Sequence, residues 1–501
     1  MTTTTLPAIV EALLNPAIYD HPVTGAIELI QTHVSYVFLT GDYVYKLKKP
    51  VNFGFLDYST LEKRKHFCDE ELRLNQRGAA ELYLGVLPIT QAGDKFTLRG
   101  EGEPVDYVVK MRQFPQSALL SEMYDRGELT EQHLSDLAKV LAAFHKSAPT
   151  NDYILSFGEV SQIRQAIDEN YDQTVGYIGV AQTQEQFEQT KAYTDKLFAE
   201  NEALFKNRVE HRFIRECHGD VHLRNICFWN NKILLFDCIE FNEPFRFVDT
   251  MFDIAYIIMD FDARNRPDLS NLFLNAYLEQ SGDWEGLQVL PLYNSRQSYV
   301  RAKVTSFLLS DPSVPESVKA ESKETASRYY RLSWEYTKLK QGKIILMSGL
   351  SGSGKSTIAS KLARESGAIQ IRSDAVRKHL GGVALDAKGD DSLYSPEMTQ
   401  KTYDRLLNLG VTLASQGYAV ILDAKYDRQA LRAPVIEQAQ AHGIPIEILY
   451  CEASEDILRD RIAQRQGDIS DATIEILTQQ QMEPFTEMEK PFVKTMDTSN
   501  N

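Results

Sequence analysis

The sequence has few features of a secreted or membrane protein. Its five cysteines, an odd number in 501 residues, are scattered and form no Cys-x-x-Cys pair. This pattern argues against a disulfide framework and against a zinc site. No apolar run approaches the ~18 residues that indicate a membrane span. The threonine-rich start has neither the basic nor the apolar part of a signal peptide. We therefore expect a cytoplasmic protein without a membrane partner.

Positive charge is also scarce. The chain has 54 Lys and Arg against 70 Asp and Glu, a formal net charge of −16. Because nucleic-acid-binding proteins usually carry a basic surface, this balance argues against nucleic acid as the main partner. The length exceeds what one hydrophobic core usually serves, so we expect more than one domain. No pattern in the sequence sets the oligomeric state.

The hydrophobic pattern divides the chain into four segments. Residues 1–115 contain short β-like runs, residues 116–310 are mainly helical with one strand–loop–strand insert, and residues 311–342 form a charged helical connector. In residues 343–501 apolar strands alternate with helices, which predicts a parallel α/β sheet. The expected fold class is therefore multidomain, combining α+β and α/β parts. The β-like runs are 34–39, 43–47, 105–111, 344–348, 419–422 and 446–450, and a helical stretch covers 60–77.

A glycine-rich motif opens the last segment. The sequence Gly349-Leu-Ser-Gly-Ser-Gly-Lys-Ser356 fits G-x-x-x-x-G-K-[ST] and stands between a β-like run and a helical one. Backbone N–H groups at such a helix N-terminus bind nucleotide phosphates, while the lysine reaches the β- and γ-phosphates and the last serine binds Mg²⁺. We therefore predict an ATP and Mg²⁺ site. The predicted nucleotide-binding residues are Gly349, Leu350, Ser351, Gly352, Ser353, Gly354, Lys355, Ser356 and Thr357.

Charged residues near the next strand ends suit a kinase site. Asp423 ends a strand-like run, where a carboxylate holds Mg²⁺ through water; a helix cap is the alternative. Asp374 is a candidate base for an attacking hydroxyl, and Arg377 is a candidate to steady the substrate or the transferring group. An N-capping Asp with an incidental Arg is the other interpretation. Arg461 and Arg465 lie one helical turn apart, either on a mobile lid that neutralises phosphate charge or on a solvated helix face.

Together with Gly467-Asp-Ile-Ser-Asp471, these residues resemble small P-loop kinases. The similar proteins are the zeta-toxin, polynucleotide kinase and chloramphenicol phosphotransferase group, and the resemblance covers about residues 342–501. It implies a P-loop NTPase with a parallel sheet and a helical lid. It does not identify the acceptor.

A second group of kinase-like residues lies in the middle of the chain. In His218-Gly-Asp-Val-His-Leu-Arg-Asn225, the Asp and the Asn stand five residues apart. Protein kinases use this spacing for the Asp that positions the acceptor hydroxyl and the Asn that holds Mg²⁺. A strand-like run at 232–236 then leads to Asp237, where a second metal-binding acid is expected. We interpret His222 as a residue that packs the loop.

The lysine of this second site is expected on the run 43–47. We favour Lys46 over Lys48 as the residue that contacts the α- and β-phosphates. Glu70 or Glu71, on the helical stretch that follows, would be its ion-pair partner. Surface lysines on an edge strand are the alternative.

These residues resemble the aminoglycoside phosphotransferase and choline kinase superfamily. Its motif His-Gly-Asp-x-His-x-x-Asn is complete here, and the resemblance covers about residues 25–310. It implies a bilobal protein-kinase-like fold at the N-terminus. The segment 32–42, which would cover the phosphates, has no glycine-rich run, and Glu240 is a candidate extra polar group in the metal site. The implied roles are catalytic base for Asp220, metal ligand for Asn225 and Asp237, and brace of the catalytic loop for Asp253.

The leading hypothesis is a bifunctional small-molecule kinase. Each half would use Mg·ATP and transfer the γ-phosphoryl group to a hydroxyl acceptor. The whole chain resembles a bacterial fusion family in which an aminoglycoside phosphotransferase-like domain precedes an ATP-binding kinase domain. Two alternatives stay open: a P-loop ATPase switch joined to a non-catalytic ligand sensor, and a nucleic-acid 5′-end kinase, against which the acidic charge weighs.

Overall fold

The computed structural model describes residues 6–464 and 467–499. Its chain forms two compact units, each described here by itself. Throughout the described part of the chain, every helix is too short or too polar to cross a bilayer. Unit 1 comprises residues up to 130 with 147–163 and 206–257, and unit 2 comprises 131–146, 164–205 and 258 onward.

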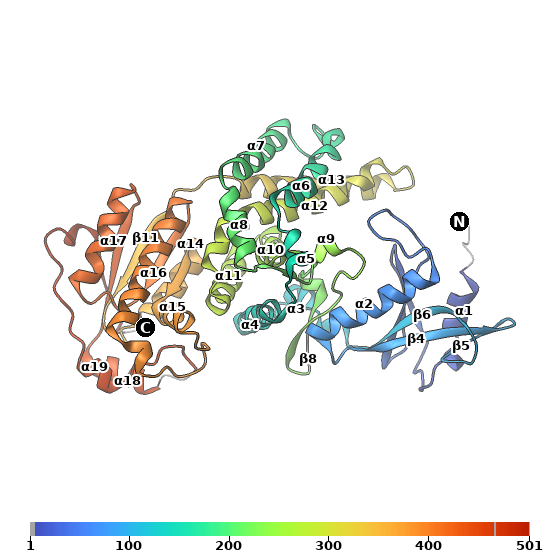
Figure 1. Cartoon of the computed structure of the whole chain (residues 1–501), viewed down its shortest axis with the longest axis horizontal. Coiled ribbons are helices and arrows are strands. Elements are labelled where there is room, and N and C mark those ends of the chain that lie inside the picture. The colour runs from blue at the N-terminus through green and yellow to red at the C-terminus, as the bar shows by residue number, and fades with distance from the viewer. Residues whose placement is uncertain (1–5, 465–466, 500–501) are drawn as a thin grey trace. The chain divides into compact units, whose positions relative to one another are not determined.

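An antiparallel sheet of six strands begins unit 1 (Figure 1). The strand order is β1-β2-β3-β6-β4-β5, and α2 lies along β4 and β6. Because side chains alternate along a strand, Lys46 and Lys48 of β3 share one face. The bounds are Glu28–Gln31 (β1), Ser35–Leu39 (β2), Tyr43–Lys48 (β3), Tyr83–Ala92 (β4), Lys95–Leu98 (β5), Pro104–Arg112 (β6) and Leu61–Ala79 (α2).

The elements expected in this region agree with the structure, but three strands of the sheet, β1, β4 and β5, were not among them. The expected strands and helix correspond to β2, β3, β6 and α2, and the Thr60 hydroxyl caps α2 by accepting the N–H of Lys63. The β4–β5 hairpin was missed. Its two-residue loop, Gly93-Asp94, lies between the two strands, and Gly93 adopts φ +61°. A Gly-Asp pair between alternating runs is a hairpin signal that was available in the sequence.

The rest of unit 1 carries two short strand pairs. Strands β7 and β10 pair with each other, and β8 and β9 form a hairpin. The hairpin loop is Asn230-Asn231, and both residues have positive φ, as a primed two-residue turn requires. This hairpin is the expected strand–loop–strand insert. The strands are Ile214–Glu216 (β7), Ile226–Trp229 (β8), Lys232–Leu235 (β9) and Phe247–Asp249 (β10).

Long helices make up the first part of unit 2. The charged connector is α13, which packs along α12 and also contacts α7. These helices are α7 (Gln184–Glu200), α11 (Pro267–Ser281), α12 (Leu290–Ser310) and α13 (Glu316–Tyr336). Other helices of the chain are α4 (Glu131–Ser147), α6 (Val160–Asp172), α8 (Glu202–Glu210) and α10 (Thr250–Ala263).

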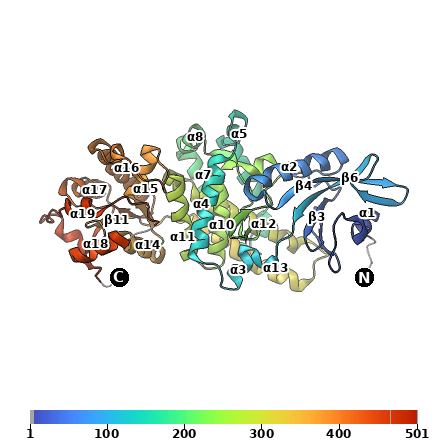
Figure 2. The same cartoon turned by 90° about the horizontal axis from the view of Figure 1, so that it is seen from below.

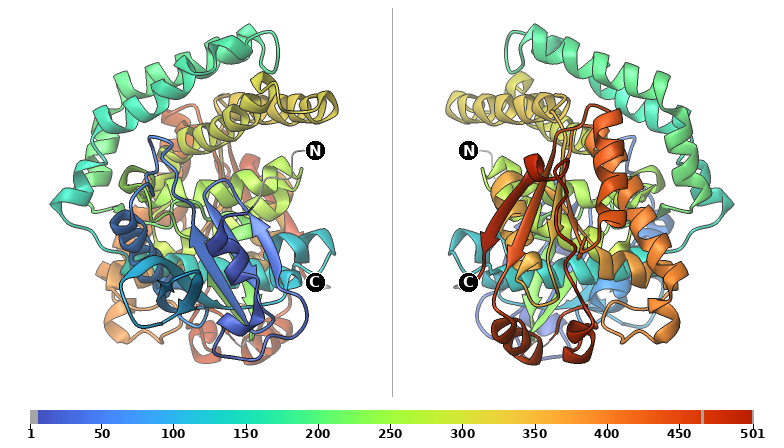
Figure 3. Two further views of the ribbon diagram at one scale, coloured as in Figure 1. Left: turned by 90° about the vertical axis from the view of Figure 1, so that its right-hand side faces the viewer. Right: turned by 90° about the vertical axis from the view of Figure 1, so that its left-hand side faces the viewer.

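A parallel sheet of five strands completes unit 2 (Figure 2; Figure 3, right). Its order is β12-β13-β11-β14-β15, with α14 and α16 packed against it. Residues 344–347 of the central strand β11 are apolar and buried, as expected for a sheet covered on both faces. The strands are Lys343–Ser348 (β11), Ile369–Arg372 (β12), Ala419–Asp423 (β13), Ile446–Glu452 (β14) and Val493–Asp497 (β15). The helices are Lys355–Ser366 (α14), Ser373–Gly381 (α15), Pro396–Ser415 (α16), Gln429–Ala441 (α17), Glu455–Gln464 (α18) and Ile474–Thr478 (α19).

A buried ion pair in unit 2 provides a test of stability. The Arg432 guanidinium donates to both carboxylate oxygens of Glu489 at 2.7 and 3.1 Å, and both side chains are almost fully buried. Arg432→Met removes the cation and leaves the acid buried. We expect the free energy of unfolding to fall by roughly 3–5 kcal/mol, measured by urea denaturation.

The matched control is Arg331→Met on α13, because the Arg331–Glu335 pair is more than half exposed. It should leave the urea midpoint nearly unchanged. Equal shifts of the urea midpoint in the two variants would show that the loss of stability does not come from burial of the Arg432–Glu489 pair.

Candidate functional site

The catalytic-loop motif of unit 1 is braced by one buried carboxylate. Asp253 accepts the backbone N–H groups of His218 at 2.9 Å and of Gly219 at 2.8 Å. Gly219 has φ +86°, and a Cβ atom there would lie 2.7 Å from the carbonyl oxygen of Phe245. The loop therefore needs glycine at this point. The structure places Asp253 where the implied brace should be.

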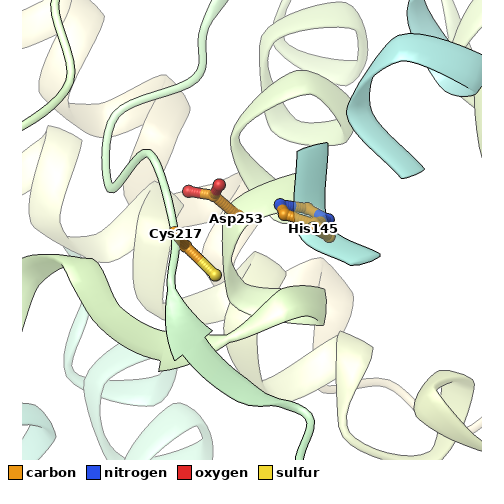
Figure 4. A group of neighbouring side chains, drawn as sticks. All are labelled: His145, Cys217 and Asp253. Atoms are coloured by element: carbon orange, nitrogen blue, oxygen red, sulfur yellow. The ribbon is translucent and has the colours of Figure 1, made fainter. Parts of the chain in front are cut away.

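Cys217 precedes this loop and lies beside Asp253 (Figure 4). Its thiol donates to the carbonyl oxygen of Val248 at 3.5 Å, and burial raises the pKa of the thiol well above its usual value. Both oxygens of Asp253 already accept backbone N–H groups. We therefore interpret Cys217 and Asp253 as structural residues and not as metal ligands.

Partly buried Asp220 and buried Asn225 come together in the loop. The Asn225 side-chain amide donates to the backbone oxygen of Asp220 at 2.9 Å and to its carboxylate at 3.3 Å. His222 caps the short turn 223–225 by accepting the N–H of Arg224. His218 is buried, and its Nε2 lies 2.9 Å from the oxygen of Phe236. Burial lowers the pKa of His218, so it is a neutral structural residue.

Lys46, the lysine expected on β3, forms an ion pair with Asp237, the expected second acid. Lys46 donates to Asp237 at 2.8 Å and lies 2.8 Å from the Glu71 carboxylate. Asp237 has φ +63°, and its N–H donates to the hydroxyl of Tyr83. Burial favours the neutral form of Asp237, but the charge of Lys46 outweighs it and holds the pKa below its usual value. Of the two candidate partners, Glu71 pairs with the lysine, whereas Glu70 pairs with Arg73.

The second lysine shares the Glu71 carboxylate with Lys46. Lys48 is fully buried and donates to Glu71 at 2.6 Å and to Glu240. The Tyr58 hydroxyl also donates to Glu240. Glu240, which we expected as an extra group in the metal site, is instead buried against β3. Sequence reasoning missed this contact, because it joins residues that are 192 positions apart.

The P-loop of unit 2 lies in a cleft of about 450 Å³. Among the predicted residues, Ser351, Gly352, Gly354, Lys355, Ser356 and Thr357 line it. Gly349, Gly352 and Gly354 all have positive φ, and a Cβ atom on Gly352 would lie 2.7 Å from the oxygen of Leu458. No side chain caps α14, so its first N–H groups are available for an anion. Gly349, Leu350 and Ser353 support the loop without lining the cleft.

Among the residues that the structure describes, no carboxylate lies within bonding distance of Lys355. Its ammonium donates to the backbone oxygen of Leu350 at 2.7 Å, with the Ser353 hydroxyl at 3.4 Å. Burial lowers its pKa to about 8, although the charge of Asp423 acts in the opposite direction. A buried cation whose hydrogen-bond partners are neutral oxygens is well suited to bind phosphate.

Two carboxylates reach this cleft from strand ends. Asp423 ends β13 and accepts the side-chain amide of Gln370 at 2.8 Å. Asp374 lies in the first turn of α15, and burial raises its pKa above the usual value. Arg372 lines the cleft too and donates to Asp468 at 2.7 Å. Sequence reasoning missed Arg372, although its place at the end of β12 was a usable signal.

Of the three predicted arginines, Arg461 lines the cleft and Arg377 does not, whereas Arg465 is not described. Arg377 is buried outside the cleft lining, where it donates to the oxygen of Leu393 and to Thr399 at 3.2 Å. Its role beside the phosphates stays a prediction. Arg461 of α18 lines the cleft and donates to the oxygen of Thr498 at 2.6 Å. Arg465 lies outside the described residues.

The donor sets fit a metal–nucleotide complex at both sites. In unit 2 the uncapped helix end, Lys355, the Ser356 hydroxyl and Asp423 converge on one cleft. In unit 1 an amide oxygen and a carboxylate, Asn225 and Asp237, are available with Lys46 nearby. Oxygen donors of this kind are those that Mg²⁺ prefers.

Two family models match parts of this chain. Residues 109–290 match the model of a family described as "Phosphotransferase enzyme family", and residues 344–485 match one described as "AAA domain". Similar solved structures include a choline/ethanolamine kinase family protein from Mesorhizobium loti, 12% identical over 66% of this chain and 100% of that one, with a TM-score of 0.37. Another is the Mycobacterium tuberculosis APS kinase, 25% identical over 25% of this chain and 70% of that one, with a TM-score of 0.22.

Fold and sites define a nucleotide-binding phosphotransferase in which a kinase-like domain precedes a P-loop kinase-like domain, as the sequence predicted. The chain belongs to the same family as uncharacterized proteins of Mycobacterium tuberculosis and Mycobacterium bovis. It is 32% identical to them over 463 residues, which cover 91% of this chain and 90% of each relative.

The lowered pKa of Lys355 predicts how nucleotide affinity depends on pH. Below about pH 8 the ammonium is charged before a nucleotide arrives, whereas above it the protein must take up a proton on binding. We therefore expect Mg·ATP affinity at this site to fall as pH rises above about 8, by at most about tenfold per pH unit. Titration calorimetry of the full chain at pH 7 and pH 9.5 measures this.

The control is Lys355→Arg, whose guanidinium stays charged over this range. It should bind with little pH dependence, even if more weakly than the parent. The same decline in both proteins would show that another group controls it.

Proposed function

We propose that this protein is a bifunctional, ATP- and Mg²⁺-dependent kinase that acts on small molecules in the cytoplasm. Each domain transfers the γ-phosphoryl group of ATP to a hydroxyl of its own acceptor. The observation that supports this most is that each of the two units holds a full set of lysine, metal-binding oxygens and a candidate base, separate from the other set.

In the N-terminal site, each named residue has one role. Lys46, held by Glu71, binds the α- and β-phosphates, while Asn225 and Asp237 hold Mg²⁺. The lowered pKa of Asp237 keeps it ionised for this task. Asp220, fixed by the Asn225 amide, accepts the proton of the acceptor hydroxyl.

In the P-loop site, backbone amides of residues 349–357 and Lys355 bind the triphosphate. Ser356 and Asp423 hold Mg²⁺, which when bound neutralises charge on the phosphate oxygens. Asp374 takes the acceptor proton, and its raised pKa brings it closer to the value that suits a base near neutral pH. Arg461 adds positive charge beside the loop.

The test is a product screen with single-site variants of the full chain. The parent is incubated with Mg·ATP and a panel of metabolites and aminoglycosides, and phosphorylated products are found by mass spectrometry. Asp220→Asn should lower one set of products by ~10²–10⁴-fold and leave the other set unchanged, because only the N-terminal base is lost. Lys355→Ala should do the reverse.

The matched control is Asp69→Asn, an acid on α2 whose pair with Lys65 is about half exposed. It should behave as the parent. Products that depend only on Lys355 would reject the bifunctional proposal and favour a non-catalytic N-terminal domain. Phosphorylation of oligonucleotide 5′ ends would favour a nucleic-acid kinase instead.

A further inference from the structure

Helix α11 lies against the P-loop fold, although it comes before it in the chain. It falls within the segment that matches the phosphotransferase family, yet it packs on α14 and β12 inside unit 2 (Figure 2). Strand β12 is at the edge of the parallel sheet, where it pairs with β13. The outer side of such a strand presents backbone groups without a strand partner.

Asparagine side chains of α11 satisfy these backbone groups. The Asn275 side-chain oxygen accepts the backbone N–H of Gln370 at 2.7 Å. The side-chain amides of Asn271 and Asn275 both donate to the backbone oxygen of Ala368, at 2.9 and 3.0 Å. Asn275 therefore bonds to β12 as a neighbouring strand would, through one donor and one acceptor. This contact fixes the position of Gln370.

Gln370 connects α11 to Asp423, which lines the cleft. Its side-chain amide donates to the Asp423 carboxylate at 2.8 Å, and its side-chain oxygen accepts the hydroxyl of Ser360 on α14. The far end of the strand is held as well, because Glu279 of α11 lies 3.6 Å from Arg372, which lines the cleft. Both ends of β12 are thus positioned by α11.

We propose that α11 is a positioning element of the P-loop site, with Asn275 acting through Gln370 to orient Asp423. This rests on the proposed function, in which Asp423 holds Mg²⁺. A carboxylate that is free to rotate binds a cation less well than one held by a hydrogen bond. The P-loop kinase site therefore includes residues of the preceding phosphotransferase segment.

The experiment measures the Mg²⁺ dependence of ATP turnover in the full chain. All variants carry Asp220→Asn to silence the N-terminal site, and the signal is the ADP formation that Lys355→Ala abolishes. Asn275→Ala should raise the Mg²⁺ concentration for half-maximal turnover by roughly tenfold, the lower end of effects seen when a ligand's hydrogen-bond partner is lost. Gln370→Leu should do the same.

A double variant distinguishes positioning of Asp423 through Gln370 from a general loss of structure. If Asn275 acts through Gln370, Asn275→Ala with Gln370→Leu should shift the Mg²⁺ requirement no further than either change alone. The control is Asp268→Asn on the same helix, since Asp268 is about half exposed and pairs with Arg266. It should match the parent.

Two results would count against the inference. An unchanged Mg²⁺ requirement in Asn275→Ala, or independent shifts that add in the double variant, would overturn it and leave the proposed function standing. Absence of any Lys355-dependent ADP formation in the parent would overturn the proposed P-loop activity, and the inference with it.

Discussion

Both sites depend on how a buried lysine charge is balanced. In unit 1, burial favours neutral Lys46, but Asp237 and Glu71 outweigh it and raise its pKa well above the usual value. In unit 2, the oxygens that the described residues place in bonding range of Lys355 are a carbonyl and a hydroxyl, and burial lowers its pKa to about 8. The first lysine is therefore held in place by acids before any ligand binds. The second gains its strongest partner only when an anion arrives.

The edge of the parallel sheet imposes the second constraint. An edge strand needs partners for its outward backbone groups, and here side chains of α11 provide them at Ala368 and Gln370. A helix used in this way cannot be removed without exposing β12. This explains in physical terms why α11 groups with the P-loop fold rather than with the sheet of unit 1.

Local motifs were predictable from the sequence, but contacts between distant segments were not. The P-loop and the His-Gly-Asp loop are each one unbroken stretch of sequence. The flanking secondary structure could therefore be placed around each of them. Sequence spacing does not tell which face of α15 meets the cleft, so the contact of the Arg377 guanidinium with Leu393 could not be predicted. The choice between Glu70 and Glu71 depends in the same way on which face of α2 meets β3. Asn275 carries no signal, since it lies 95 residues from its partner.

The opposite pKa shifts of two acids suit the different tasks proposed for them. Asp237 must stay ionised to hold a metal, and the nearby ammonium of Lys46 lowers its pKa. Asp374 must accept a proton, and burial outweighs the charges of Arg372 and Arg377 to raise its pKa. Environments that shift the pKa values of two carboxyl groups in opposite directions suit one group to hold a metal and the other to accept a proton. Arg377 therefore still acts on Asp374 through its charge, although its guanidinium does not line the cleft.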